Sequence, residues 1–235
     1  MTEELEKLPL GDIETLTGSL AQRVYAVLRE AILHMRCPPG TVLRKGQICE
    51  QLGVSRSPVA EAIAKLSGEG LVDVVPQSAT RVSRFSMSVI REATFLREAL
   101  ELAAVERVAQ TITEEQLVAL TRNLKLQRLL VEDGDHAGFF EADEDFHNMI
   151  MAFTGYQGVT RTLAGVSLQL SRARILLLPS SDRAQESLRE HEEVLEALRR
   201  RDAETARSAM RFHLGQLISR IEPLEHVHSD FFVAQ

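Results

Sequence analysis

The stretch ICEQLGVSRSPVAEAIAKL, residues 48–66, predicts two short helices joined by a sharp turn. Gly53 can adopt the left-handed backbone that commonly ends a helix, and Ser57 and Pro58 suit the N-cap and the first position of the next one. Apolar residues line one face of each helix, at Ile48, Leu52, Val59, Ile63 and Leu66. This pattern is typical of a helix-turn-helix, whose second helix enters the DNA major groove by its N-terminal end.

Basic and hydroxyl side chains lie around this turn, outside the apolar faces. We expect Ser55, Arg56 and Ser57 to contact base edges, since arginine to guanine is the commonest specific pairing. Arg44 and Lys45 precede the first helix, and we expect them to contact phosphates. These five residues form the predicted centre of a DNA-binding surface.

A two-stranded hairpin is predicted directly after the helices. Residues 71–75 and 80–84 have the alternation of strands, and residues 76–79 (PQSA) form the turn between them. Arg81 and Arg84 would face outward, so this wing could lay cations along DNA phosphates. Helices plus a hairpin of this kind make a winged helix-turn-helix.

The distribution of charge supports a separate DNA-binding head. Residues 19–84 hold 9 Lys or Arg against 5 Asp or Glu, whereas residues 1–18 hold 1 against 5 and residues 85–235 hold 17 against 24. The net charge of −7 therefore hides a basic module attached to an acidic one. The N-terminus lacks the design of a signal peptide and no apolar run reaches membrane length, so we expect a cytoplasmic protein. The two cysteines are too few for a disulfide framework.

The chain divides into four predicted parts. Residues 1–18 form a flexible N-terminal arm, and residues 19–85 form the winged helix-turn-helix domain, whose first helix Ser19 can cap. Residues 86–222 form an all-helical metal- and effector-binding domain. Residues 223–235 form a C-terminal tail.

The large second part is helical throughout. Apolar residues recur with helical spacing in six segments, and no glycine-rich phosphate loop or GxSxG elbow interrupts them. The fold class is therefore mostly α, with an all-α C-terminal bundle of about six helices. The predicted helices cover residues 88–110, 113–132, 135–153, 158–178, 182–200 and 202–221, with Gly134, Gly155 and Pro179 at joins.

Four polar residues fall on the apolar faces of these helices. Asp143 and His147 are spaced by one helical turn beside inward phenylalanines, and His191 and His213 align with the leucines of two later helices. A buried carboxylate needs compensation. Three imidazoles and one carboxylate can provide it by binding a divalent ion, and this donor set suits zinc, nickel or manganese.

The motifs resemble those of GntR-family bacterial transcription regulators, in particular the FadR-like subfamily with an FCD ligand-binding domain. The resemblance covers about residues 19–220. The stretches that carry it are GVSRSPV at 53–59, EAI at 61–63, REALE at 97–101, DEDFH at 143–147, EH at 190–191 and MRFHL at 210–214. It implies a helical bundle that encloses a metal at the four residues above, where the metal helps to hold a small carboxylate effector.

The resemblance also suggests effector-binding residues. Arg97 matches the position whose guanidinium faces the effector, and a bidentate contact with a carboxylate would suit it. Arg174 belongs to a basic pair near the expected pocket. Tyr156 stands where the family commonly has an asparagine, so the effector could differ from small hydroxy acids.

This chain departs from the family pattern in the head. Ala60 replaces a second arginine of the recognition helix, which predicts an altered operator with more of the specificity on Arg56. Ala79 replaces a glycine at the tip of the wing. Met35 and Arg36 occupy a region that usually holds a glycine, which affects the geometry of the turn.

The sequence thus predicts a DNA-binding transcription regulator, a repressor that acts as a homodimer on a pseudo-palindromic operator. A carboxylate bound beside the metal would control operator binding. A metal-dependent hydrolase or lyase on the same site is an alternative, but no catalytic residue is predicted, because Glu144 and Asp145 are turned away from it. A pure metal sensor, in which the ion itself is the effector, is a third hypothesis.

Overall fold

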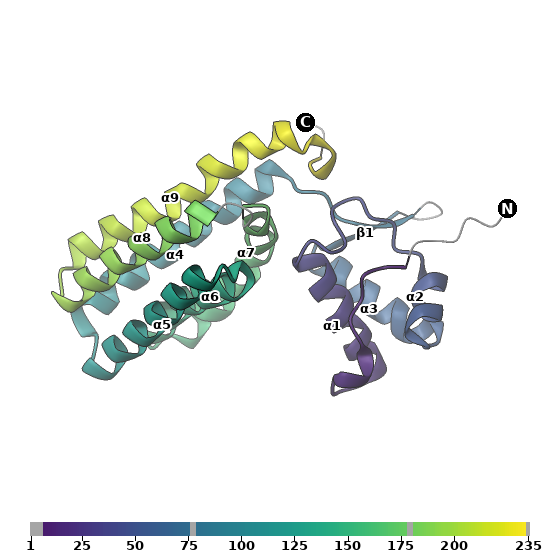
Figure 1. Cartoon of the computed structure of the whole chain (residues 1–235), viewed down its shortest axis with the longest axis horizontal. Helices are drawn as coiled ribbons and strands as arrows, with labels where there is room; N and C mark the ends of the chain where they lie inside the picture. Colours follow the sequence, from purple (N-terminus) through teal and green to yellow (C-terminus); the bar gives the residue numbers. More distant parts are fainter. Residues whose placement is uncertain (1–6, 76–78, 178–180, 234–235) are drawn as a thin grey trace. The chain divides into compact units, whose positions relative to one another are not determined.

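The chain forms two compact units in the computed structural model, which describes residues 7–75, 79–177 and 181–233 (Figure 1). The N-terminal unit consists of Met1–Met87 together with Glu225–Gln235, and the helical unit consists of Ser88–Leu224. The last residues of the chain therefore belong with its beginning. The fold class is confirmed, with a small winged head and an otherwise helical body.

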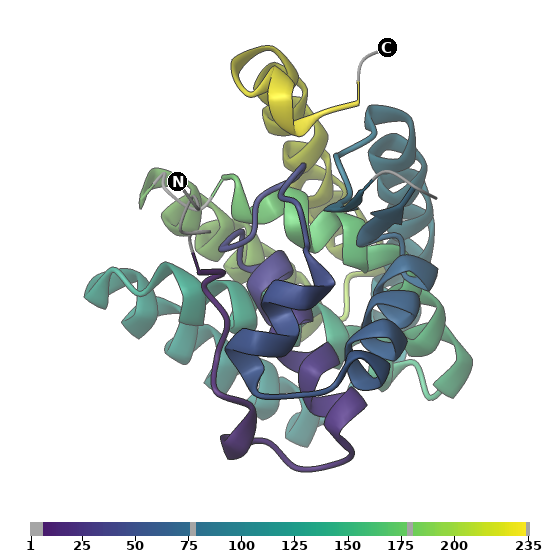
Figure 2. The ribbon, with the colours of Figure 1, turned by 90° about the vertical axis from the view of Figure 1, so that its right-hand side faces the viewer.

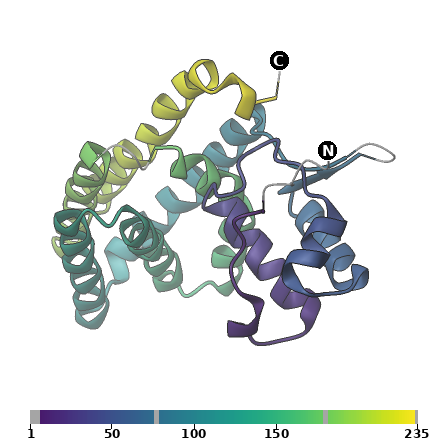
Figure 3. The same ribbon diagram turned by 45° about the vertical axis from the view of Figure 1, so that its right-hand side comes forward.

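Three helices build the core of the N-terminal unit: α1 (Leu20–Leu33), α2 (Lys45–Leu52) and α3 (Arg56–Gly68). They lie together in Figure 3, with α1 packed along α3. Ser19 caps α1 through a reciprocal pair of hydrogen bonds with Gln22. Most of the predicted inward residues are buried, among them Val24, Val27, Leu28, Ile48, Val59, Ile63 and Leu66, whereas Leu52 is half-buried.

The turn between α2 and α3 begins as predicted and ends differently. Gly53 has the left-handed backbone (φ 65°) that the sequence predicted. The N-cap of α3 is Ser55, two residues before the predicted Ser57. Pro58 consequently occupies the third helical position, which it can fill because N–H groups of a first helical turn have no acceptor in the helix. Met35 adopts a positive φ of 56° after α1, in the region of Met35 and Arg36 where the resemblance leads one to expect a glycine.

The wing is a short antiparallel hairpin of β1 (Val72–Val74) and β2 (Thr80–Val82). Val82 is buried and Arg81 is exposed, so the predicted alternation is confirmed. Backbone bonds from Val75 to Ala79 and from Ser83 to Leu71 continue the pairing past both strand ends. The predicted turn residues 76–78, like the predicted break at Pro179, lie outside the described residues.

The terminal segments make contacts that the expectation of loose ends did not include. Ile13 lies in a short 3₁₀ helix, η1 (Ile13–Thr15), and is buried. The backbone of Leu8 exchanges two hydrogen bonds with the side chain of Gln51. At the other end, Phe232 is buried against Phe85, with ring centroids 5.4 Å apart. Figure 2 shows the chain turning back after its last long helix.

The helical unit is formed by α4 (Met87–Thr111), α5 (Glu114–Asp133), α6 (His136–Phe153), α7 (Gln157–Ile175), α8 (Ser181–Arg199) and α9 (Ala203–Val227). Helix α5 packs against α6 and α8, while three ion pairs join α4 to α9 in antiparallel order, at Glu106–Arg207, Glu98–Arg211 and Arg91–Glu222. Helix α9 continues beyond the predicted end at residue 221, through Pro223.

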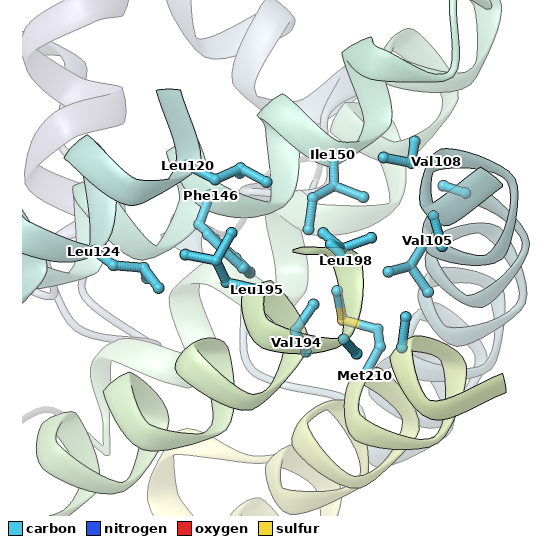
Figure 4. Packing of buried hydrophobic residues seen from close by; sticks show 14 of the residues in the cluster. Val105, Val108, Leu120, Leu124, Phe146, Ile150, Val194, Leu195, Leu198 and Met210 are labelled. Atoms are coloured by element: carbon cyan, nitrogen blue, oxygen red, sulfur yellow. The ribbon is translucent and has the colours of Figure 1, made fainter. Parts of the chain in front are cut away.

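Apolar side chains from five of these helices meet in one core (Figure 4). Val105 and Val108 of α4 and Met210 of α9 lie on one side, and Phe146 of α6 points toward Leu195 of α8. This core fixes the facing sides of α6, α8 and α9. Among the described residues, no helix has both the length and the apolar character that a membrane span requires.

Candidate functional site

Four polar side chains from three helices converge inside the helical unit. Asp143 and His147 lie on α6, His191 on α8 and His213 on α9. One donor atom of each lies within 4.8 Å of the others. The Nε2 atom of His213 is 3.1 Å from that of His147 and 3.3 Å from that of His191. The structure thus brings together, fully buried, the four residues that the sequence predicted as metal ligands. We call them the ligand cluster.

The other ring nitrogen of each histidine has its own acceptor. Carboxylate oxygens only accept hydrogen bonds, and the amide nitrogen of Gln127 is directed to Asn123 and to the carbonyl of Ala142. The histidines therefore carry their protons on Nδ1 and turn their Nε2 lone pairs toward one another. The three contacts are His147 to Glu101 Oε2 at 2.5 Å, His191 to Gln127 Oε1 at 2.9 Å and His213 to Glu190 Oε2 at 2.6 Å.

The environment also sets the protonation of the ligand cluster. Burial, reinforced by the neighbouring His213, holds the pKa of His191 well below its usual value. Burial lowers the pKa of His213 to about 4. Burial alone would raise the pKa of Asp143, but Arg174 and the histidines outweigh it and hold that pKa well below its usual value. At neutral pH these groups are in the deprotonated form that binds metal.

This arrangement fits a divalent metal ion. Three lone pairs that face one another without a proton between them repel, and a cation among them removes the repulsion. Metal–nitrogen bonds of about 2.0–2.1 Å place two ligand nitrogens about 3.0 Å apart at right angles and about 3.4 Å apart in a tetrahedron. The measured separations of 3.1 and 3.3 Å lie in this range. The ligand cluster could therefore hold a metal.

A small cavity of about 60 Å³ adjoins the ligand cluster, and Asp143 and His213 form part of its wall. Three guanidinium groups line it, from Arg97, Arg174 and Arg183. The rest of the lining is largely apolar, with Phe139, Phe140, Leu177, Ala184, Leu214 and Leu217. Because a buried water needs about 10–15 Å³, this arginine cavity suits a ligand of a few non-hydrogen atoms.

Two predicted effector-binding residues lie in the arginine cavity, each with a carboxylate partner. Arg97 is buried and donates from Nε to Glu101 at 2.5 Å. Arg174 pairs with Asp143 of the ligand cluster, and its guanidinium lies 4.8 Å from the centre of the Phe140 ring. Both arginines are thus placed beside the metal ligands and are held there by acids.

Tyr156 lies elsewhere. It occupies the N-cap position of α7, its side chain is 55% exposed, and its ring faces the guanidinium of Arg107 at 4.6 Å. Because its ring turns outward from the start of α7, Tyr156 is not among the residues that line the arginine cavity. The cavity lining thus gives no support to the expectation that Tyr156 contacts an effector, which stays a prediction.

The predicted DNA-contacting residues are exposed on the N-terminal unit. Ser55 and the two residues after it form the start of α3, where Ser57 donates to Glu61 at 3.2 Å. Arg81 extends from β2 and donates to the carbonyl of Gly40 at 3.2 Å. The exposed set is Arg44, Lys45, Ser55, Arg56, Ser57 and Arg81.

Sequence reasoning missed several residues of the site. Gln127 and Asn123 lie on the inner face of α5 together with Leu120 and Leu124, and both are buried. They show the same signal, a polar residue in an apolar stripe, that singled out the ligand cluster. Arg183 gave no such signal, because it stands at the start of a highly charged helix.

Comparison with known families divides the chain in the same place as the structure. Residues 20–82 match the model of bacterial regulatory proteins of the gntR family. Residues 92–216, slightly more than half of the chain, match the FCD domain. The first region contains the winged helix-turn-helix, and the second contains the whole ligand cluster.

Individual relatives and structures agree with these matches. The HTH-type transcriptional repressor RspR of Escherichia coli is 32% identical over 92% of this chain and 95% of its own. A regulator from an unstable DNA locus of Streptomyces ambofaciens is 33% identical over 89% of this chain and 88% of its own. Among solved structures, McbR/YncC of E. coli (TM-score 0.74, 22% identity) and a GntR regulator of Rhodococcus (TM-score 0.75, 23% identity) share the fold, each over 88% of this chain and 99% of that chain.

Proposed function

Since the chain belongs to the GntR family and is a DNA-binding transcription regulator with an FCD domain, we propose that a small carboxylate effector, bound beside a metal in the helical unit, controls its binding to an operator. The observation that carries this proposal is the ligand cluster beside the arginine cavity. Residues 19–85 would serve as the DNA-binding domain and residues 86–222 as the sensing domain.

The charges around the arginine cavity favour an anionic effector. Each of its three arginines is paired with a buried acid, at Arg97–Glu101, Arg174–Asp143 and Arg183–Glu190. Two further acids lie at the edge of ion-pair range, Glu144 at 3.7 Å from Arg174 and Glu186 at 3.8 Å from Arg183. The three buried pairs are neutral as a set, so a divalent ion in the ligand cluster would add two positive charges beside the cavity. A bound ion supplies open coordination positions for a carboxylate, and guanidinium groups match a carboxylate with two parallel hydrogen bonds. The apolar part of the lining would receive the remainder of the effector.

The donor set bears on the identity of the metal. Three imidazoles and one carboxylate suit zinc, nickel or manganese, and their order of affinity alone does not choose among them. The ligand cluster is buried, so metal exchange would require an opening of the helical unit.

On the DNA side, the exposed start of α3 would enter the major groove. Arg56 would read a base edge, Arg44 and Lys45 would contact phosphates, and Arg81 would follow the backbone from the wing. We further propose that the protein represses transcription, as RspR does. It would act in the cytoplasm as a homodimer on a two-fold symmetric operator. Two copies on a pseudo-palindrome would each read one half-site.

Operator binding under controlled metal content tests the proposal. A fluorescent duplex from the region upstream of the gene would be titrated with metal-free protein and with protein loaded with zinc, nickel or manganese. Each titration would be repeated with a panel of small carboxylates. We expect at least one carboxylate to change operator affinity only when metal is present.

A matched pair of variants separates the ligand cluster from other histidines. His191→Ala removes a buried ligand and should abolish the carboxylate response, whereas His226→Ala, exposed at the end of α9, should respond as the wild type does. If operator affinity changes with metal and no carboxylate alters it further, the protein would be a metal sensor instead. A response that survives chelation would refute a role of metal, and the absence of operator binding at low salt would refute the regulatory role altogether.

A further inference from the structure

Arg97 connects the arginine cavity to the ligand cluster through a single carboxylate. The Nε group of Arg97 donates to Oε1 of Glu101 at 2.5 Å. The other oxygen of Glu101, Oε2, lies 2.5 Å from Nδ1 of His147. Glu101 is 1% exposed and is not part of the cavity wall. The guanidinium is thus the part of this chain of contacts that a ligand in the cavity can touch.

A second chain of contacts has the same order. Arg183 also lines the arginine cavity, and its two terminal nitrogens donate to the two oxygens of Glu190 at 2.8 and 2.9 Å. Oε2 of Glu190 lies 2.6 Å from Nδ1 of His213. Two of the three ligand histidines are therefore oriented by an acid that an arginine of the cavity neutralises.

The third histidine provides the contrast. His191 contacts Oε1 of Gln127, an uncharged amide whose nitrogen is engaged by Asn123 and by the backbone of Ala142. No arginine of the cavity is among these partners in the part of the chain that the structure describes. Through their Nδ1 atoms, two ligand histidines are thus linked to arginines of the cavity by an acid, whereas the third is held by an uncharged amide.

We propose that Arg97 and Arg183 are positioning residues that couple carboxylate binding in the cavity to metal affinity, acting through Glu101 and Glu190. This inference rests on the proposed function and adds its internal regulation. A guanidinium has five N–H donors, so Arg97 can bond Glu101 and an incoming carboxylate together. The incoming anion draws on the same positive charge, which leaves Glu101 less neutralised and a stronger acceptor from His147.

The direction of the coupling follows. A stronger acceptor at Nδ1 makes the histidine a better donor at Nε2, so a carboxylate in the cavity raises metal affinity beyond any direct contact with the ion. Since coupling free energies are reciprocal, the metal raises carboxylate affinity by the same factor. An effector and a metal that are each weak alone would then bind well together.

A double-mutant cycle on Arg97 and Glu101 tests this with Mn²⁺ alone, measured by competition with a chromogenic chelator. Glu101→Gln keeps an oxygen acceptor but loses the charge, and should weaken Mn²⁺ binding by about 10–100-fold. Arg97→Met leaves Glu101 fully charged, and should tighten Mn²⁺ binding by about fivefold or more. In the Arg97→Met/Glu101→Gln double variant this tightening should vanish.

The cycle distinguishes coupling from simpler roles. A merely structural ion pair predicts that Arg97→Met weakens Mn²⁺ binding, and direct repulsion of the ion by Arg97 predicts equal tightening in both backgrounds. Either result would overturn the inference and leave the proposed function standing. A wild-type protein that binds none of the three metals would instead overturn the proposed function. Thermal unfolding of each metal-free variant checks that it is folded.

A second measurement uses propionate as the carboxylate probe, because it is a weak chelator of metals. Propionate should raise the Mn²⁺ affinity of the wild type. The ratio of Mn²⁺ affinities with and without propionate should shrink toward one in Glu101→Gln. Gln127→Met is the matched control, since it also removes an acceptor from a ligand histidine but touches no arginine; it should weaken metal binding and keep the ratio. An equal ratio in Glu101→Gln would overturn the inference. Metal affinity that acetate, propionate and succinate all leave unchanged would overturn the proposed carboxylate effector as well.

Discussion

Replacing Phe232 by alanine should release the end of the chain from the N-terminal unit. Phe232 is 3% exposed and packs on Phe85, which is 1% exposed and joins the wing to α4. Two backbone bonds hold the same pair of segments, from Phe85 N–H to the carbonyl of Phe231 at 2.9 Å and from Val233 N–H to the carbonyl of Phe85 at 2.8 Å.

The size of the effect follows from the buried ring. Truncation of a buried phenylalanine to alanine costs about 3–5 kcal/mol. A terminal segment can detach without unfolding the rest of its unit, so the loss is limited to the free energy that docks this segment. After the ring contact is lost, backbone bonds such as those at Phe85 cannot hold the segment, because net hydrogen bonds contribute only about 0.5–1.5 kcal/mol each. We therefore expect detachment of residues 228–233 with the helices α1–α3 still folded.

Amide hydrogen exchange reports on this directly. The Phe85 amide donates to the detached segment, so its protection should fall by about a hundredfold or more in Phe232→Ala, at about 1.4 kcal/mol per factor of ten. Amides in the middle of α3 should keep their protection. Val233→Ala is the control, because Val233 is 53% exposed and contributes its backbone but little buried surface. A Phe85 amide whose protection stays within about twofold of the wild-type value would refute the reasoning.

Three further predictions concern DNA, pH and metal. Arg56→Ala should reduce the preference for operator over random DNA by about 1–3 kcal/mol. Lys45→Ala should weaken binding to the two DNAs alike and lower the slope of log affinity against log salt by about one. Competition binding at several salt concentrations measures these effects, and an unchanged preference in Arg56→Ala would contradict the first prediction. Burial, followed by a hydrogen bond to Glu69, raises the pKa of Tyr25 to about 12, so the folded state keeps a proton that the unfolded chain loses near pH 10. The free energy of unfolding, measured by denaturant titration, should therefore fall between pH 10 and 12, and it should fall less steeply in Tyr25→Phe. Metal at about a hundredfold above its dissociation constant should stabilise the helical unit by about 2.7 kcal/mol; thermal melts of His213→Ala should lose this gain, and an equal gain in that variant would place the metal elsewhere.

Local sequence signals were sufficient for the head. Ser19, Gly53 and the buried residues of α3 act through contacts within a few residues, and the structure agrees with them. The start of α3 differed by two residues, because Pro58 is compatible with more than one position in a first turn. The docking of Phe232 on Phe85 could not be predicted in this way, since the two residues are far apart in the chain and neither carries a local signal.

The ligand cluster could be predicted because helix geometry is strict. Once Asp143 and His147 stand one turn apart among inward phenylalanines, their side chains must share the face that the core fixes. His191 and His213 follow from the same rule on two other helices. The packing of α6, α8 and α9 brings the four residues together. The pattern of apolar residues predicts that these helices pack on one another, but it does not give the distances between their side chains.

The hydrogen-bond partners of the predicted metal ligands were harder to predict than the ligands themselves. Glu101 stands four residues after Arg97, so their pairing is local, and the sequence could have suggested it. Its second contact, to His147, joins α4 to α6 and depends on how those helices pack. The role that we propose for Arg97 changes with that contact, from a residue that only meets an effector to one that also neutralises the acid behind a proposed metal ligand. Sequence reasoning could therefore place the arginine in the site, but only the three-dimensional contacts show that it lines the cavity and also pairs with the acid behind His147.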